Sequence, residues 1–209
     1  MTMDRLALFG ASGHGKVVAD AALAAGWRSV VFFDDAWPAR EANRHWPVIG
    51  DLAAMLAGAD AFDAAIVSIG NCQVRWEKQR ALAAAGIPLA TVVHPRACVS
   101  RFAALGAGTV AMAGAVVNAD AVIGEACIVN TGATIDHDCT LAHGVHVSPG
   151  ANLSGGVRVG ACSWIGVGAA VRQGIEIGNG VMIGAGAVVV GPVKDGATVV
   201  GNPARDHIK

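Results

Sequence analysis

The fold is decided by residues 122–147, which read VIGEACIVNTGATIDHDCTLAHGVHV. An aliphatic residue recurs here at every sixth position, at Ile123, Val129, Ile135, Leu141 and Val147. Each is followed four positions later by a small or β-branched residue, and the period runs unbroken from Val99 to Val189, with Ala111 its weakest member. A period of six is neither the 3.6 of an α-helix nor the 2.0 of a simple strand. It indicates a hexapeptide β-solenoid.

Each six-residue unit of such a solenoid supplies one short strand and one tight turn. Three units close a triangular coil, so equivalent residues stack 18 positions apart, and successive coils lie about 4.8 Å apart. The aliphatic residue and the small residue four positions later both point inward, while the turns favour glycine, asparagine and aspartate. The register from Val99 to Val189 predicts fifteen units, which make five coils.

The composition narrows the class of protein. The chain has 209 residues, a formal charge of −1 and no basic stripe that would bind nucleic acid. Its five cysteines show no paired spacing, and Cys127 and Cys139 fall at inward positions of the repeat. We therefore expect a reduced, cytoplasmic protein. The amino terminus lacks the pattern of a signal peptide.

One uncharged run, residues 102–119, has nearly the length of a membrane span. It contains Gly106, Gly108 and Gly114 and keeps the six-residue phase throughout. We therefore expect this run to form part of the solenoid and expect no membrane span.

The first part of the chain follows a different pattern. Apolar runs at 6–9, 29–33, 63–69 and 88–93 alternate with helical stretches at 16–25 and about 73–85. Strands that alternate with helices predict a small parallel sheet of Rossmann-like βαβαβ type. We expect two domains, an α/β domain at 1–95 and a β-helix with a carboxyl-terminal tail at 96–209.

Three polar loops follow strands of the expected sheet: residues 10–15 (GASGHG), Asp34-Asp35 and Gly70-Asn71. Ligands bind parallel sheets at the carboxyl ends of the strands. The glycine loop reads GxxGxG, not the dinucleotide fingerprint GxGxxG, and would let backbone N–H groups approach a phosphate at a helix amino terminus. The acidic pair lies where a dinucleotide site holds a ribose hydroxyl. A plain strand–helix turn is the alternative, and the domain has no room for a full NAD site.

His137 lies in a turn of the repeat, outside the inward ladders, and Asp138 follows it directly. A neutral imidazole, with an ordinary pKa near 6.5, can act as a general base, and an adjacent carboxylate can orient it. The alternative is an exposed turn histidine without a role. A metal site with Cys139, His143 and His146 is not expected, because the repeat projects His137 and His143 from adjacent faces and turns Cys139 inward.

These residues resemble the bacterial sugar-nucleotide acetyltransferases of the NeuD/PglD group, within the hexapeptide acyltransferases. The resemblance covers essentially the whole chain. Its motifs are Gly10 to Gly15, Asp34-Asp35, Ile69-Gly70-Asn71, His94-Pro95, Asn118-Ala119, Val129 to Cys139, His146 to Gly150, and Gly201 to Ala204.

The resemblance implies a left-handed parallel β-helix, a nucleotide-sugar-binding domain at 1–95 and acetyl-CoA as the donor, without a metal. It also implies a homotrimer with active sites between subunits. By motif position, His137 is the general base, Asp138 its polarising partner and Gly155 the source of an oxyanion-binding amide. The sugar-nucleotide contacts are Ser12, Gly13, His14, Asp34, Asp35, Gly70 and Asn130. The acetyl-CoA contacts are His146, Val167 and Ala185, whereas His143 matches no motif.

The reaction implied is acetyl transfer to the 4-amino group of a nucleotide-linked 4-amino-4,6-dideoxyhexose, with a UDP-linked bacillosamine precursor as the first expectation. The alternatives are a GDP-perosamine type of N-acetyltransferase and a sialic acid O-acetyltransferase. A non-catalytic β-helix binding module is a further alternative, although it would not require His137-Asp138 beside an intact glycine loop.

Overall fold

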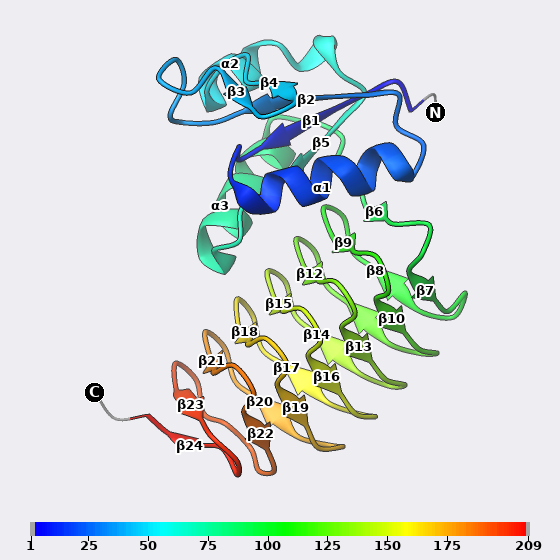
Figure 1. The fold of residues 1–209 in the computed structure, drawn as a ribbon, viewed down its shortest axis with the longest axis vertical. Coiled ribbons are helices and arrows are strands. Elements are labelled where there is room, and N and C mark those ends of the chain that lie inside the picture. Colours follow the sequence, from blue (N-terminus) through cyan, green and yellow to red (C-terminus); the bar gives the residue numbers. More distant parts are fainter. Residues whose placement is uncertain (1–2, 208–209) are drawn as a thin grey trace. The chain divides into compact units, whose positions relative to one another are not determined.

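The computed structural model describes residues 3–207, and the chain forms two compact units, Met1–Pro95 and Arg96–Lys209. Figure 1 shows the elements of both. The first unit contains β1 (Arg5–Phe9), α1 (Gly13–Ala24), β2 (Ser29–Phe33), β3 (Ala42–Asn43), β4 (Trp46–Pro47), α2 (Leu52–Ala57), the short helix η1 (Ala59–Ala61), β5 (Ala64–Val67), α3 (Cys72–Ala84) and β6 (Val92–Val93).

The sheet of the first unit is parallel and has the strand order β2-β1-β5. Its three carboxyl ends therefore meet at one edge, where the three polar loops begin. Helix α1 starts at Gly13, three residues before the expected start, because Ser12 is extended and serves as its N-cap residue. Of the expected strand 88–93, only Val92–Val93 forms a strand, β6, and it is not part of this sheet. Leu89 makes a single bridge to Ala65 of β5, since Pro88 offers no N–H for pairing.

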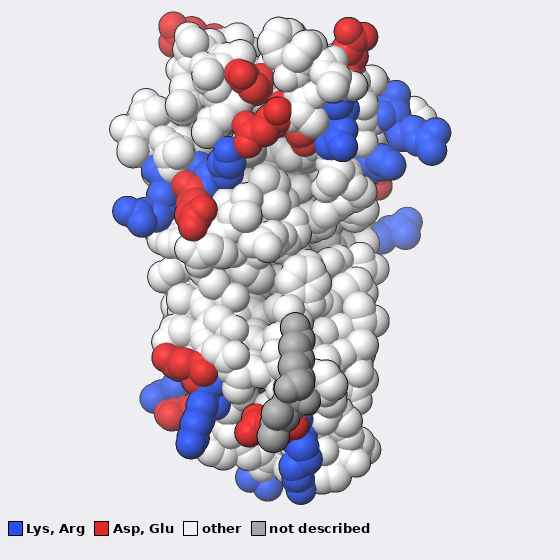
Figure 2. Space-filling model, turned by 90° about the vertical axis from the view of Figure 1, so that its left-hand side faces the viewer, with Lys and Arg blue, Asp and Glu red and all other residues white. Residues whose placement is uncertain are grey.

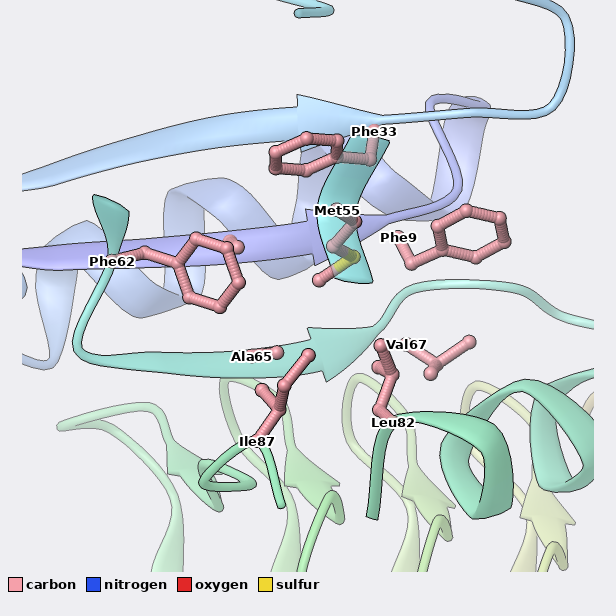
Figure 3. Packing of buried hydrophobic residues seen from close by; sticks show 9 residues of the cluster. Phe9, Phe33, Met55, Phe62, Ala65, Val67, Leu82 and Ile87 are labelled. Carbon is pink, nitrogen blue, oxygen red and sulfur yellow. The ribbon is translucent and has the colours of Figure 1, made fainter. Parts of the chain in front are cut away.

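One face of this sheet carries the apolar cluster drawn in Figure 3. Ala7, Phe9 and Val67 are buried there, and the Phe33 and Phe62 rings meet edge to face with centroids 6.1 Å apart. Met55 of α2 and Leu82 of α3 cover the cluster. A fully buried side chain of this size stabilises the fold by about 1.5–3 kcal/mol. This packing holds the strand ends, and hence the loops, in place.

The second unit is a parallel β-solenoid with three faces (Figure 1). The first face contains β7 (Cys98–Val99), β10 (Val116–Val117), β13 (Thr134–Ile135), β16 (Asn152–Leu153), β19 (Ala170–Val171) and β22 (Val188–Val189). The second contains β8 (Ala104–Leu105), β11 (Val122–Ile123), β14 (Thr140–Leu141), β17 (Arg158–Val159) and β20 (Glu176–Ile177). The third contains β9 (Val110–Ala111), β12 (Ile128–Val129), β15 (His146–Val147), β18 (Trp164–Ile165), β21 (Met182–Ile183) and β23 (Thr198–Val200), and β24 (Arg205–Asp206) pairs antiparallel with β23.

The turns between faces form three corners. We call the turns from the first to the second face, such as 136–138, the first corner; those from the second to the third face, such as 142–144, the second corner; and those from the third back to the first, such as 148–150, the third corner. Every sixth residue from Gly108 to Gly186 has a positive φ at these corners. Glycine fills most of these positions, as expected for a left-handed turn residue, and the exceptions are Asp120, Ala126, Asp138 and Cys162.

The expected stacking is confirmed. Val117 pairs with Ile135, and Ile135 with Leu153, each 18 residues apart. Cys127 and Cys139 are fully buried inside the coils, and so is the weak member Ala111. The 18-residue ladder therefore places every side chain of one coil directly against its equivalent in the next.

The number of coils was underestimated, since a sixth follows the expected five. Val193 pairs with Ile177 and Val199 pairs with Ile183, so this last coil is two residues shorter than the others. The shortening at Gly191-Pro192 puts Asp195 where the strict period requires an aliphatic residue. This is why the sequence period ends at Val189 while the solenoid continues.

Among residues 3–207, no helix is long and apolar enough to cross a membrane. The uncharged run 102–119 contains the short strands β8, β9 and β10, and its apolar side chains belong to the solenoid.

The close approach of successive coils makes Gly160 a test of the fold. A Cβ atom at Gly160 would lie 2.5 Å from the carbonyl carbon of Gly178 in the next coil. Gly160→Ala should destabilise the protein by about 1–3 kcal/mol, as over-packing does. Gly191→Ala is the control, because nothing lies within 4 Å of a Cβ there. Thermal unfolding followed by circular dichroism measures both, and equal midpoints for the two variants would contradict the packing argument.

Candidate active site

His137 and Asp138 form a contact pair on the first corner, directly after β13. The imidazole Nδ1 lies 2.6 Å from the Asp138 carboxylate oxygen Oδ2, and both side chains are more than half exposed. Asp138 has a φ of +59°, in the left-handed region that aspartate tolerates better than most residues. The carboxylate thus fixes the ring and leaves Nε2 as the nitrogen that can exchange a proton with a ligand.

A second carboxylate flanks His137 on its other side. The Asp136 Oδ1 atom accepts hydrogen bonds from the His137 backbone N–H and from Nδ2 of Asn118 in the preceding coil, both at 2.8 Å. The Asn118 hydrogen bond, followed by the one from the His137 backbone, lowers the pKa of Asp136 below its ordinary value. The hydrogen bond to Asp138 and then the charge of Asp136 raise the pKa of His137 above 6.5. The arrangement favours the imidazolium that forms when His137 accepts a proton.

Gly155 lies beneath His137 in the following coil. A Cβ atom at residue 155 would come 2.5 Å from His137 Nε2 and 2.6 Å from Cε1. Only glycine therefore allows the imidazole its observed place. The Gly155 carbonyl accepts the Gly174 N–H, and within residues 3–207 the Gly155 N–H has no hydrogen-bond partner.

Asn130 and His146 meet at the third corner and the third face. Asn130 Nδ2 lies 3.1 Å from His146 Nε2; because an amide nitrogen donates, Nε2 is the acceptor. The His146 ring packs 4.0 Å, centroid to centroid, from that of Trp164, and only 4% of His146 is exposed. Val167 and Ala185 are exposed on successive turns of the third corner, where Gly186 N–H donates to the Val167 carbonyl.

The predicted site residues of the solenoid therefore fall into two groups within one chain. His137, Asp138 and Gly155 share the first corner, while Asn130, Val167 and Ala185 share the third, and a whole face separates these corners. Cys139 is buried inside the coil, and its Sγ donates to the Ser154 carbonyl. In the described part of the chain, no three His, Cys, Asp or Glu side chains gather as they would around a metal ion.

The segment of the solenoid that carries His137 is poor in basic residues, and Arg158, directly after this segment, forms an ion pair of 3.7 Å with Glu176. Residues 102–157 contain four carboxylates, those of Asp120, Glu125, Asp136 and Asp138, and no lysine or arginine. On the face drawn in Figure 2, the charged side chains of the second unit gather at its last coils and the middle coils are uncharged. The pKa of His137 is therefore governed by carboxylates.

In the first unit, Asp34 holds the glycine loop in shape. Its Oδ2 accepts the Ala11 N–H at 2.6 Å, and its Oδ1 accepts the Ala36 N–H at 2.9 Å. Nη1 of Arg40 donates both to that Oδ2 and to the Ala11 carbonyl, each at 3.1 Å. Asp35 is more exposed and forms an ion pair of 2.6 Å with Lys78 of α3. Asp34 thus orders the glycine loop, whereas the more exposed carboxylate of Asp35 is the one that a ligand could reach.

The remaining predicted residues of this unit line the same edge of the sheet. Ser12 and Gly13 are exposed at the start of α1, and the Ser12 carbonyl accepts Nδ2 of Asn43. Burial, and then the charge of Arg75, lowers the pKa of His14 to about 4, so its imidazole is neutral at pH 7. Arg75 donates to the carbonyls of Ile69 and Gly70 at 2.8 and 2.7 Å and thereby fixes the third loop.

Sequence reasoning missed several of these residues. Arg40 and Asn43 lie in a segment without periodicity, and nothing in the sequence marks them as partners of the glycine loop. Arg75 could have been noticed as a charged residue one turn after the N-cap Asn71 of α3, where the structure buries it. Asp136 shows the same kind of signal, a carboxylate in the turn that holds His137.

Comparison with known proteins gives consistent matches. The sequence model of the PglD N-terminal domain family matches residues 5–82. A UDP-N-acetylbacillosamine N-acetyltransferase from Bacillus subtilis (strain 168) is 36% identical over 117 residues, or 53% of this chain and 52% of that protein. The chain thus aligns with about half the length of this curated relative.

Solved structures match over nearly the full length. The acetyltransferase domain of PglB from Neisseria gonorrhoeae FA1090, in complex with acetyl coenzyme A, has a TM-score of 0.93 and 45% identity, covering 97% of this chain and 98% of that one. A histidine-to-asparagine mutant of perosamine N-acetyltransferase from Caulobacter crescentus, in complex with CoA and GDP-perosamine, has a TM-score of 0.94 and 36% identity, covering 98% and 97%. The expected fold class, a small parallel sheet followed by a β-helix of hexapeptide repeats, is confirmed.

The contact between His137 and Gly155 can be tested without a ligand. Gly155→Ala should push the imidazole off the backbone of residue 155 and break its contact with Asp138, because the new Cβ would overlap Nε2. The pKa of His137 should then fall towards its ordinary value, since the largest cause of its rise is lost. Titration of the His137 ring protons by NMR measures this, with Ser154→Ala as the control. An unchanged pKa in the Gly155 variant would show that the ring does not rest on Gly155.

Proposed function

We propose that this chain, which belongs to the NeuD/PglD-type family of bacterial sugar-nucleotide acetyltransferases, transfers the acetyl group of acetyl-CoA to the 4-amino group of a nucleotide-linked 4-amino-4,6-dideoxyhexose. The observation that carries the proposal is the 2.6 Å contact between His137 and Asp138 above the Gly155 amide. A purely binding module would not require this pair. The five cysteines are free thiols, which supports a reducing compartment such as the cytoplasm.

In the proposed reaction, the sugar amine attacks the thioester carbonyl carbon while His137 Nε2 accepts a proton from the amine. A C–N bond forms, the C–S bond breaks, and the CoA thiolate leaves with the proton that His137 returns. General-base help contributes about 10²–10⁴ in rate. The Gly155 N–H is proposed to stabilise the oxyanion, a contribution of about 10²–10³ for one donor.

The nucleotide is proposed to be uridine diphosphate. The similarity to the Bacillus subtilis UDP-N-acetylbacillosamine N-acetyltransferase supports a UDP-linked bacillosamine precursor. The similarity to the Caulobacter crescentus perosamine N-acetyltransferase favours a GDP-linked 4-amino sugar as the second candidate. Acetylation of a sialic acid hydroxyl is the third.

A panel assay separates these candidates. Acetyl-CoA is incubated with UDP-linked and GDP-linked 4-amino sugars and with sialic acid, and thiol release is followed. We expect turnover with the UDP-linked amine, reduced at least about 10²-fold in His137→Ala, whose turn position carries little packing. No thiol release with any acceptor would overturn the proposed function. Full turnover by His137→Ala would remove His137 from the role of base.

The active site is proposed to form between subunits of a homotrimer. Within one chain the base and the Asn130 group lie on different corners, so they can converge only if the first corner of one subunit faces the third corner of its neighbour. His137→Ala and Asn130→Ala should each be inactive. When the two are unfolded and refolded together, about one quarter of the wild-type activity should return, because one interface in four pairs an intact His137 with an intact Asn130.

Light scattering on the same samples measures the mass of the assembly and hence the number of subunits. A fully active monomer, or trimers that regain no activity after mixing while each variant refolds alone, would contradict the shared site.

The glycine loop is proposed to bind the diphosphate of the sugar nucleotide. Gly13 is exposed, has no positive φ, and has open space within 4 Å of the point that a Cβ atom would occupy, so Gly13→Val should leave the fold intact. The valine would block the approach of a phosphate to the backbone and should raise the KM for the sugar nucleotide strongly, without changing CoA affinity. Ala24→Val adds similar bulk at the far end of α1 and is the control. Weaker CoA binding by calorimetry with an unchanged sugar-nucleotide KM would reverse the two domain assignments.

A further inference from the structure

We propose that Asp136 is a positioning residue for the base. With Asn118 it fixes the backbone of His137, and it keeps beside the imidazole a negative charge that Asp138 alone does not supply. The inference rests on the proposed role of His137, and no motif of the sequence assigned a role to Asp136.

Hydrogen bonds to Asp136 hold the backbone of His137 in place. Asp136 is the first residue of the turn, and its Oδ1 accepts two hydrogen bonds of 2.8 Å. One comes from the amide of Asn118, which stacks 18 residues earlier on the same corner, and the other from the N–H of His137 itself. The preceding coil thereby holds the peptide that carries the base. These hydrogen bonds fix the direction of the His137 Cα–Cβ bond, independently of the contact between Asp138 and the ring.

The imidazole ring of His137 is held by other residues. Asp138 reaches Nδ1 from the left-handed turn position, and Gly155 supports Nε2 from the following coil. Asp136 makes no hydrogen bond to the ring; its influence there is purely electrostatic. Each of three neighbours therefore holds a different part of His137. Asp136 bonds its backbone N–H, Asp138 contacts Nδ1 and Gly155 leaves the space in which the ring lies.

The charged groups around His137 are carboxylates. The turn of His137 supplies Asp136 and Asp138, and the preceding turn supplies Asp120. The following turn, Ser154-Gly155-Gly156, supplies no titratable group, and the Cys139 thiol points inward, where burial raises its pKa. Among residues 3–207, no lysine or arginine forms an ion pair with Asp136 or Asp138. Asp136 stays ionised through its two hydrogen bonds, and its charge acts on His137 without compensation by a cation.

These roles can be separated by substitution. Asp136→Asn keeps an oxygen that can accept both hydrogen bonds but removes the charge. The base needs its neutral form, so activity rises with pH as His137 loses its proton. Removal of a negative charge lowers the pKa of His137, and the acid limb of the kcat profile should move to lower pH by about 0.5 unit, as for an exposed unit charge at close range. Its plateau should fall as well, because the base is weaker.

Asp136→Ala also removes the backbone hold and should lower kcat at least fivefold further, while the KM for acetyl-CoA stays within twofold of the wild-type value. Asp120→Asn is the matched control. It lies at the same turn position as Asp138 one coil earlier, has a φ of +61° that asparagine tolerates, and is not among the groups that shift the pKa of His137. It should leave both the profile and kcat unchanged.

NMR titration of His137 in the ligand-free protein tests the electrostatic part independently of any substrate. A lowered pKa in Asp136→Asn, with wild-type thermal stability, supports the proposal even if the acetyl acceptor is misassigned. An unchanged pKa in Asp136→Asn, or a kcat and acid limb in Asp136→Ala equal to those of Asp120→Asn, overturns it. Failure of the wild-type protein to release thiol in the panel assay would instead overturn the proposed function.

Discussion

The ladder of parallel strands, in which each residue pairs with the one 18 positions later, is the constraint on which the second unit depends. Hydrogen bonds between successive coils leave no freedom of register, because a slip by one residue would turn the aliphatic ladder outward. Stacking then brings together side chains that are remote in sequence, such as Asn118 and Asp136, or His137 and Gly155. The candidate base is therefore assembled from three consecutive turns of one corner.

The same ladder sets the backbone conformation of residue 138, where the contact with His137 requires an aspartate rather than a glycine. Its backbone must adopt the left-handed conformation that recurs every six residues, and at most other corners glycine meets this demand without strain. Asp138 adopts the conformation with a side chain, and that side chain reaches His137 Nδ1. A turn residue that costs some stability here orients the imidazole, which is the usual relation between backbone strain and a functional site.

Periodic parts of the molecule could be predicted from the sequence, and aperiodic parts could not. The inward positions of Cys127 and Cys139, and the turn position of His137, follow from counting in sixes. The sixth coil was not predicted, because the corner at Gly191-Pro192 is shortened and the six-residue period of aliphatic residues ends there. In the first unit, the strand ends that hold the three loops could be recognised, but Arg40 and Arg75 depend on tertiary contacts that no local pattern encodes. The division of the candidate site residues between two corners follows from the repeat, whereas their proposed meeting across subunits would depend on an assembly that the period does not describe.

The distribution of charge places a further limit on how the two proposed substrates bind. Both a sugar nucleotide and acetyl-CoA carry phosphates, yet residues 102–157 offer four carboxylates and no lysine or arginine. In an assembly of identical chains the same holds for every subunit, so cations for these phosphates must come from outside this segment. The first unit offers the backbone amides of its glycine loop and Arg40 beside Ala11, and the last coils offer Arg172, Lys194 and Arg205. In the proposed transfer, the positive charge on His137 would be favoured by Asp138 and Asp136.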